Sequence, residues 1–311
     1  MYLSAKQQEG LDMKAKSKLK KLIAIGLVGI AVLGAGATFA KNLNKKAEIE
    51  KVSAQEKIEK EKEEQKQKEK EKQKYANVKN TSEEGKKYTY DARKVAKKLA
   101  SYDYSNNGKK IVFLTFDDGA SVTNTPKVLD ILKENNVKAT FFLLGDTIAN
   151  GGDYAKELVK REYNEGHAIG NHSYSHDMHK LYPGRVLDIN AFKEDYEKNE
   201  QYLKEILGDD FSTRVIRCPG GYMSWKGMQP LDEYLDKNNM ASIDWNALSA
   251  DAEGKKKNAE ELAEYAINTS KGKEMVVLLM HDTYTKEETV KSLPTIIKYF
   301  KDNGYEFRTL S

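Results

Sequence analysis

Apolar positions between residues 110 and 311 follow two alternating patterns, which together predict an α/β fold. Short runs rich in β-branched and aromatic residues suit buried strands, and seven such runs cover 111–116, 138–144, 167–170, 213–217, 240–244, 275–280 and 305–309. Helical spacing of apolar residues predicts helices between them, over 126–136, 154–165, 190–207, 231–238, 258–270 and 289–303. The alternation predicts βαβ units and a largely parallel sheet, which either closes into a barrel or stays doubly wound.

The uncharged run 22–40 predicts a membrane segment. Its 19 residues are just long enough to cross a bilayer as a helix. Several lysines precede it, and the positive-inside tendency then places residues 1–21 in the cytoplasm and the rest of the chain outside the cell. Residues 38–40 form a weak cleavage site, so a retained anchor is favoured over a cleaved signal peptide, which would release a secreted protein.

The segment 41–74 consists almost entirely of Lys, Glu and Gln and lacks a sustained apolar heptad. This composition is typical of a solvated helix or a disordered tether rather than a coiled coil. A further amphipathic helix is predicted around 90–102. The chain is therefore divided into a basic cytoplasmic segment (1–21), an anchor (22–40), a charged stalk or linker (41–107) and a globular domain (108–311).

The excess of basic over acidic residues lies in the N-terminal part of the chain. Overall there are 52 Lys and Arg against 48 Asp and Glu, a formal net charge of +4. Residues 1–21 contribute +4 and residues 41–74 contribute +3, which leaves residues 75–311 at −3. The globular part thus gives no support to nucleic-acid binding. The single cysteine, Cys218, excludes an intrachain disulfide and is interpreted as a small buried residue.

Polar residues gather directly after the predicted strands. The carboxyl ends of parallel strands meet at one edge of a sheet, where α/β folds place their functional sites. The residues at these ends are Asp117, Asp118, His172, His176, Arg217, Asp251 and His281. Asp-Asp-Gly alone is ordinary turn chemistry, and a lone histidine is more often structural. Their conjunction at one edge favours a site.

The spacing of two histidines indicates a metal site. His172 and His176 could share an ion if their loop coils into a helical turn, and one carboxylate of the first strand would complete the set. Successive strand residues point in opposite directions, so Asp118 fits a ligand and Asp117 is free to accept a proton from water. His281, on another strand, could donate that proton to a leaving group.

The region 109–311 resembles the NodB-type polysaccharide deacetylases, the fourth family of carbohydrate esterases. All five motifs of that family occur in order. The stretches 115–119 (TFDDG) and 172–176 (HSYSH) match fully, and residues 140–142 and 170–171 also resemble the family.

The resemblance implies a distorted (β/α) barrel and a divalent ion, usually zinc but alternatively another transition metal such as cobalt. It implies that Asp118, His172 and His176 hold the ion. It also implies that Asp117 is the general base and that Arg217 positions this carboxylate and keeps it ionised.

The same resemblance assigns the other half of the reaction. His281 would protonate the departing amine, with Asp251 tuning the imidazole. The backbone N–H of Gly220 would stabilise the oxyanion of the tetrahedral intermediate. Leu279 would line the pocket for the acetyl methyl group.

Two positions depart from the family pattern. Gly220 stands where the third motif usually has tyrosine, and Ala252 stands where the fourth usually has tryptophan. Both changes concern the sugar-binding groove. A replacement stacking surface could come from three aromatic residues, Tyr222, Trp225 and Trp245. Core packing is an equal alternative for Trp245.

These features lead to the expectation of a membrane-tethered, metal-dependent enzyme with a monomeric catalytic domain outside the cell. Its expected reaction is hydrolysis of N-acetyl groups on a cell-envelope glycan, with peptidoglycan N-acetylglucosamine as leading substrate. Alternative substrates are chitin oligomers, exopolysaccharide and O-acetyl xylan. A catalytically inactive glycan-binding relative is the alternative from another functional class.

Overall fold

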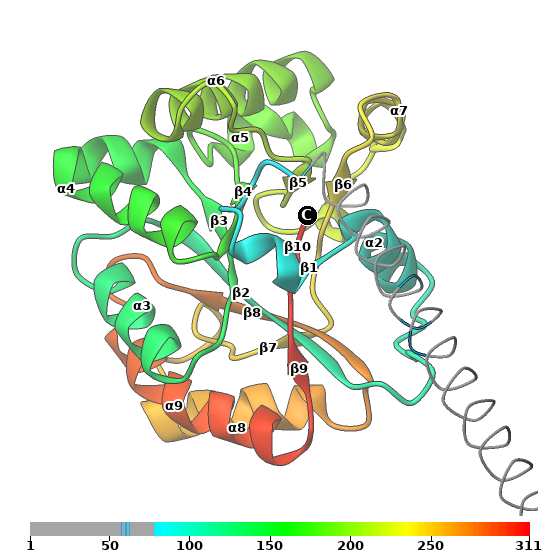
Figure 1. Ribbon diagram of the computed structural model, residues 1–311. Helices are drawn as coiled ribbons and strands as arrows, with labels where there is room; N and C mark the ends of the chain where they lie inside the picture. Colours follow the sequence, from blue (N-terminus) through cyan, green and yellow to red (C-terminus); the bar gives the residue numbers. More distant parts are fainter. Residues whose placement is uncertain (1–56, 58–59, 61, 63–77) are drawn as a thin grey trace, which may run out of the picture. The chain divides into compact units, whose positions relative to one another are not determined.

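The computed structural model describes residues 57, 60, 62 and 78–311 (Figure 1). The predicted cytoplasmic segment and anchor, residues 1–40, lie outside these residues. Among the helices that are described, none is long and apolar enough to cross a membrane. Lys57, Lys60 and Lys62 of the predicted stalk are helical and exposed.

A parallel sheet forms the centre of the compact unit Asn77–Ser311. Its strand order is β6-β5-β4-β3-β2-β8-β7, and every pair in it is parallel. The strands are β2 (Ile111–Gly119), β3 (Thr140–Leu143), β4 (Ala168–Asn171), β5 (Val215–Ile216), β6 (Ala241–Ser242), β7 (Ala247–Leu248) and β8 (Met275–His281). Within residues 78–311, β6 and β7 do not pair with each other. The expected α/β fold is therefore confirmed as an open, parallel half-barrel.

Helices surround this sheet (Figure 1). They are α2 (Ala92–Ala100), α3 (Thr125–Glu134), α4 (Gly145–Asn164), α5 (Met178–Leu181), α6 (Ile189–Leu207), α7 (Gln229–Lys237), α8 (Ala259–Ser270) and α9 (Glu287–Asp302). Short 3-10 turns occupy Gly85–Tyr88, Pro183–Arg185 and Tyr222–Ser224. All six helices predicted after residue 110 are present within a few residues of their expected bounds, except that α4 begins nine residues earlier, at Gly145.

Both faces of the central strand β2 are buried, and its alternate residues belong to different cores. Val112, Leu114 and Phe116 pack in the cluster that includes α3, α4, α8 and α9. Ile111 and Phe113 pack in a second cluster that includes α2. A strand covered on both sides has no polar face, which explains why its sequence is a continuous apolar run.

Four short strands depart from the predicted pattern. The expected strand 305–309 is split into β9 (Glu306–Phe307), which pairs with β2, and β10 (Thr309–Leu310), which pairs with β1 (Thr89–Tyr90). Neither β1 nor β7 was predicted. Each of these strands has two residues, which is too short for any periodicity to be recognised.

Residues 78–107 pack as part of the compact unit. Asn80, 2% exposed, donates from Nδ2 to the Ile169 carbonyl at 3.1 Å and to the Leu310 carbonyl at 3.0 Å. The helix expected around 90–102 is present as α2, and its Val95 side chain is fully buried. The sequence-based domain boundary at residue 108 therefore lies inside the unit.

Candidate metal and catalytic site

The carboxyl ends of β2, β8 and β4 bring the predicted site residues together. Asp117 near the end of β2 lies opposite His281, the last residue of β8. On the other side of β2 and β3, β4 ends at Asn171, so the strand delivers His172 to the same edge. The sheet topology thus assembles groups that are 164 positions apart at most, as the strand-end pattern predicted.

The two acidic residues of β2 do not face opposite ways. The β2–β3 register shifts between Asp117 and Gly119, and Asp118 has a left-handed backbone with φ of 66°. This bulge cancels the alternation of the strand, so both carboxylates approach the same imidazole. His172 Nε2 is 3.7 Å from Asp117 Oδ2 and 3.4 Å from Asp118 Oδ1. The expectation of opposite orientations was wrong, because it assumed a regular strand.

Asp118, His172 and His176 form a cluster with the geometry of a metal site. One ligand atom from each lies within 4.8 Å of the others. Asp118 Oδ1 is 3.4 Å from His172 Nε2 and 3.8 Å from His176 Nε2. Ligands held about 2.0 Å from a tetrahedral ion are about 3.3 Å apart, so small side-chain movements would close the set around an ion.

The loop that carries the two histidines is not a helical turn, contrary to expectation. Ser173 and His176 have φ of 75° and 54°, and the Ser173 hydroxyl accepts from the His176 N–H at 3.0 Å. His172 Nδ1 lies 2.8 Å from the Arg217 carbonyl oxygen. A proton on Nδ1 would donate to that oxygen and leave Nε2 with a lone pair directed at the cluster.

Electrostatics also fit a cation at this position. Asp118 Oδ1 is buried and has no hydrogen-bond partner among the described residues. Burial opposes ionisation of this carboxyl, but the fields of His172, His281 and His176 outweigh burial and lower its pKa. Burial lowers the pKa of His176, which favours the neutral imidazole that a metal requires. A buried carboxylate oxygen without a donor, beside two imidazoles, is a site that a divalent ion would complete.

Asp117 forms a separate, buried pair with Arg217. The guanidinium has no exposed surface, and its Nη1 donates to Asp117 Oδ1 at 2.7 Å and to the Thr115 hydroxyl at 2.9 Å. Its Nε donates to the Ile243 carbonyl at 2.8 Å, and its plane lies 4.1 Å from the Phe142 ring centroid. This network fixes the orientation of one carboxylate oxygen beside a guanidinium, which suits a general base.

His281 and Asp251 form the second proton-transfer pair. His281 Nδ1 is 2.9 Å from Asp251 Oδ1, and the His281 N–H donates to Oδ2 at 2.8 Å. Burial alone would lower the pKa of this imidazole, but the hydrogen bond and charge of Asp251 prevail and raise it to about 9. His281 is therefore protonated near neutral pH and can donate a proton to a leaving amine.

Gly220 and Leu279 occupy positions that suit their expected roles. Gly220 is exposed with φ of 76°, and its N–H makes no hydrogen bond within residues 78–311. Leu279 pairs in register with Thr115, two residues before the Asp117–His281 pair. The Leu279 side chain therefore faces the same side of the sheet as the His281 side chain. Leu279 is buried, with 7% of its surface exposed.

The three candidate aromatic residues differ in their surroundings. Trp225 stacks on Tyr182 with ring centroids 4.2 Å apart, and its Nε1 donates to the Pro219 carbonyl at 2.8 Å. A Cβ on Gly220 would lie 3.1 Å from the Trp225 ring, so the indole occupies the space beside the replaced position. Tyr222 donates from its hydroxyl to Asp232 at 2.7 Å. Trp245 is partly buried and packs against the second hydrophobic cluster, the one that includes α2, which supports the packing alternative for this residue.

Helix α6 supplies supporting residues that were not predicted. Asp195 Oδ2 accepts from the Tyr174 and Ser175 N–H groups at 2.9 and 3.0 Å, and thereby holds the histidine loop. Asn199 donates from Nδ2 to Asn171 Oδ1 at 2.9 Å. Both side chains are buried, four residues apart on one face of the helix. The sequence signal that could have identified them is a pair of polar residues at i and i+4 within an otherwise buried stripe of the helix.

Comparisons with known proteins agree with this geometry. A family model described as polysaccharide deacetylase matches residues 104–231. A peptidoglycan-N-acetylglucosamine deacetylase of Bacillus cereus is 33% identical over 218 residues, which is 68% of this chain and 72% of that protein.

Solved structures share the fold as well. A CE4 esterase of Streptococcus mutans is 37% identical with a TM-score of 0.68, covering 75% of this chain and 96% of that one. The catalytic domain of peptidoglycan N-acetylglucosamine deacetylase from Eubacterium rectale is 33% identical with a TM-score of 0.57, covering 67% of this chain and 91% of that one.

Proposed function

Because this chain belongs to the polysaccharide deacetylase family, we propose that it hydrolyses N-acetyl groups of a cell-envelope glycan. Peptidoglycan N-acetylglucosamine is the leading substrate. The observation that carries the proposal is the arrangement at the sheet edge, where the Asp118–His172–His176 cluster lies between an Asp117–Arg217 pair and a His281–Asp251 pair. The relatives named for this substrate support the choice of glycan.

The residues divide the work of amide hydrolysis. A divalent ion held by Asp118, His172 and His176 would supply Lewis-acid polarisation of the acetyl carbonyl. Asp117 accepts a proton from the attacking water, while Arg217 keeps this carboxylate oriented. The carbonyl carbon gains the water oxygen and becomes tetrahedral.

The second half of the reaction breaks the C–N bond. The Gly220 N–H donates to the oxyanion, and the His281 imidazolium donates a proton to the departing nitrogen. The products are acetate and a free amine on the sugar. Leu279 excludes water from the acetyl methyl group and limits the pocket to a short acyl chain.

The test is acetate release by the full chain from N-acetylated wall fragments, with the chain stripped of metal and then reloaded. We expect zinc to restore turnover, with cobalt as the next choice among divalent ions. A parallel panel of chitin oligomers, acetylated exopolysaccharide and O-acetyl xylan ranks the alternative substrates. No acetate from any of them, with metal bound, contradicts the proposed reaction.

We further propose that residues 22–40 anchor the enzyme in the membrane, with the catalytic unit outside the cell. The support is the 19-residue uncharged run and the lysines before it. Protease treatment of intact cells should remove the catalytic unit, and fractionation should place the uncut chain with the membranes. Release of the chain into the medium would instead indicate cleavage of the anchor.

A further inference from the structure

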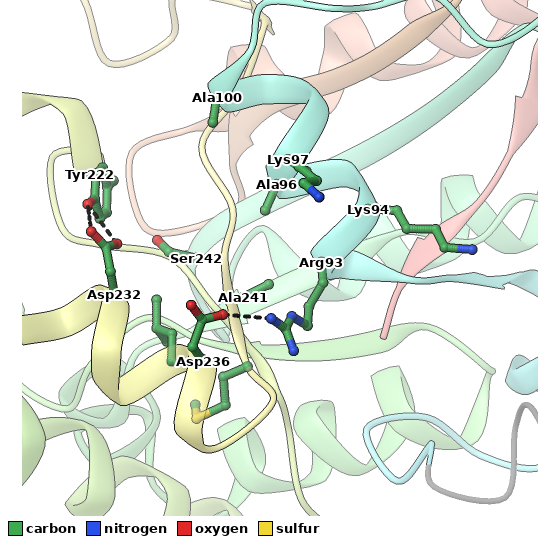
Figure 2. A pocket seen from close by; sticks show the side chains of 12 residues that line it. Arg93, Lys94, Ala96, Lys97, Ala100, Tyr222, Asp232, Asp236, Ala241 and Ser242 are labelled. Carbon is green, nitrogen blue, oxygen red and sulfur yellow. Dashed lines mark hydrogen bonds and ion pairs between the residues drawn. The ribbon is translucent and has the colours of Figure 1, made fainter. Parts of the chain in front are cut away.

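A groove separate from the metal cluster lies between helices α2 and α7 (Figure 2). It is a cavity of about 620 Å³, and none of the site residues described above lines it except Tyr222. Ala96, Lys97 and Ala100 of α2 form one wall, and Asp232 of α7 stands on the other. The Arg93–Asp236 ion pair, with N–O at 2.6 Å, crosses the groove at one end.

The floor of the groove is the open edge of the sheet. Ala241 and Ser242 of β6 line it, and β6 pairs only with β5 among the described strands. The N–H of Ala241 donates to the carbonyl of Arg214, directly before β5, and the N–H of Ile243 donates to the Ile216 carbonyl. Backbone groups of successive strand residues point to opposite sides, so the N–H and carbonyl of Ser242 face the groove. An edge of this kind can pair with an extended peptide.

The charge of the α2 wall selects the kind of peptide. Arg93, Lys94 and Lys97 line the groove, and Arg93 already pairs with Asp236. Lys94 and Lys97 are exposed and have no ion-pair partner within residues 78–311. Two unpaired ammonium groups beside a strand edge favour a peptide that carries carboxylates.

The groove and the catalytic centre share the loop after β5, which carries Gly220 and Tyr222. The Tyr222 hydroxyl donates to Asp232 inside the groove, while the Tyr222 N–H donates to Asp244 Oδ1 at 2.8 Å. A Cβ on the preceding residue, Gly221, would lie 2.9 Å from the Trp245 ring. Trp245 in turn lies 5.8 Å from the Arg217 guanidinium, which holds Asp117. A series of neighbouring residues therefore lies between the groove and the general base.

We propose that this groove binds the carboxylate-bearing peptide attached to the glycan, so that the enzyme prefers acetylated wall glycan that still carries its peptides. The inference rests on the proposed function, since it names a second part of the same substrate. The peptide would add a strand to β6, and its carboxylates would pair with Lys94 and Lys97. Binding there would draw the neighbouring sugar towards the metal cluster.

The first experiment compares wall glycan chains of one length with their peptides present and enzymatically removed. We expect kcat/KM for acetate release by the full chain to be about tenfold higher with peptides present, since each exposed ion pair is worth up to about fivefold. Lys94→Glu with Lys97→Glu should bring this ratio towards one. Ala100→Trp, which fills the groove without changing charge, should do the same.

The control is Lys127→Glu with Lys133→Glu, the same change of charge on exposed positions of α3, which should keep the ratio of the unaltered chain. A ratio of one in the unaltered chain, or a ratio that all variants share, overturns the groove assignment and leaves the deacetylase proposal intact. Circular dichroism establishes that each variant is folded.

The second experiment needs no turnover. A fluorescent synthetic peptide with two free carboxylates should bind the full chain in an anisotropy titration, and the Lys94→Glu/Lys97→Glu variant should weaken binding about tenfold or more. Peptide binding without acetate release from any glycan supports the groove and contradicts the proposed function. Equal binding by the α2 and α3 double variants, or no binding, overturns the groove.

Discussion

Arg217 is a single buried residue that contacts both the proposed base and the metal cluster, one through its side chain and the other through its backbone. Its guanidinium donates to Asp117, and its carbonyl oxygen lies 2.8 Å from His172 Nδ1 and accepts from the Tyr196 hydroxyl at 2.5 Å. The orientation of the base and that of one metal-site imidazole therefore depend on the same residue. Arginine suits this position because its planar guanidinium stays charged when buried and satisfies several acceptors together.

Asp117→Asn tests the division of labour between the two acids. The amide preserves the shape but cannot accept a proton, so we expect acetate release to fall by at least about a hundredfold. Calorimetric titration with zinc should still show binding at the histidine cluster. The matched variant Asp118→Asn should lose zinc binding as well as activity. Loss of metal in Asp117→Asn would mean that the assignment of base and ligand is wrong.

Asp251→Asn tests the origin of the acid. His281 must be protonated to donate, so activity is present below its pKa, raised to about 9, and is lost as pH rises through that value. Removing the carboxylate removes the main cause of the increase in pKa, so the alkaline limb of the kcat/KM profile should move to lower pH. The measurement is the rate of acetate release from about pH 6 to about pH 10. An unchanged alkaline limb would exclude His281 as the titrating acid.

At the scale of elements, the bulge at the end of β2 decides how the acids point. Asp118 has positive φ, and the strand continues one residue out of register with β3. Gly119 closes this bulge against buried Asp282, whose carboxylate would lie 2.7 Å from an added Cβ. A side chain at position 119 would therefore displace the segment that carries Asp118, which explains the glycine of this motif.

Helix α6 positions the histidine loop without contacting the metal cluster. Asp195→Ala removes the acceptor of two backbone N–H groups, at Tyr174 and Ser175, and should loosen the loop. We expect zinc affinity to fall about tenfold or more, as for other supports of metal ligands. Glu194→Ala is the control. The Glu194 side chain is exposed, and its ion pair with Lys180, at 3.9 Å, lies on the surface. Equal zinc affinity in both variants would show that the loop holds its own shape.

At the scale of the whole molecule, residues 78–107 complete the fold. Helix α2 buries Ala92, Val95 and Leu99 in the second hydrophobic cluster, and β1 pairs with β10. Burial of each larger apolar side chain stabilises a fold by about 1.5–3 kcal/mol, and the free energy of unfolding of a domain is about 5–15 kcal/mol. Loss of α2 would therefore remove a substantial part of the stability.

We therefore expect a fragment of residues 78–311 to unfold cooperatively and to retain activity, and a fragment of residues 108–311 to be insoluble or much less stable. Thermal unfolding followed by circular dichroism, together with acetate release, makes the comparison. A control fragment of residues 57–311 should match the first. Cooperative unfolding of the 108–311 fragment at the same temperature would contradict this role for α2.

The sequence alone was sufficient for the alternation of long elements and for the set of site residues. Strands such as β2 and β8 carry enough apolar residues to be recognised, and parallel pairing brings their carboxyl ends to one edge. The supporting residues Asp195 and Asn199 could not be predicted, because their partners lie far away in the sequence. Asp195 accepts from backbone N–H groups of the histidine loop, and Asn199 donates to the Leu143 carbonyl and to the Asn171 side chain. Local periodicity contains no information about such partners.

What the sequence determined by itself is the family, the order of strands and helices, and which residues meet at the sheet edge, since these depend on local patterning and on the rule that parallel strands end together. Tertiary structure alone decided the common direction of Asp117 and Asp118, the inclusion of residues 78–107 in the compact unit, and the groove beside β6. Each of these depends on contacts between segments far apart in the chain: β2 with β3, β1 with β10, and α2 with α7. Such contacts follow from packing rather than from the local pattern.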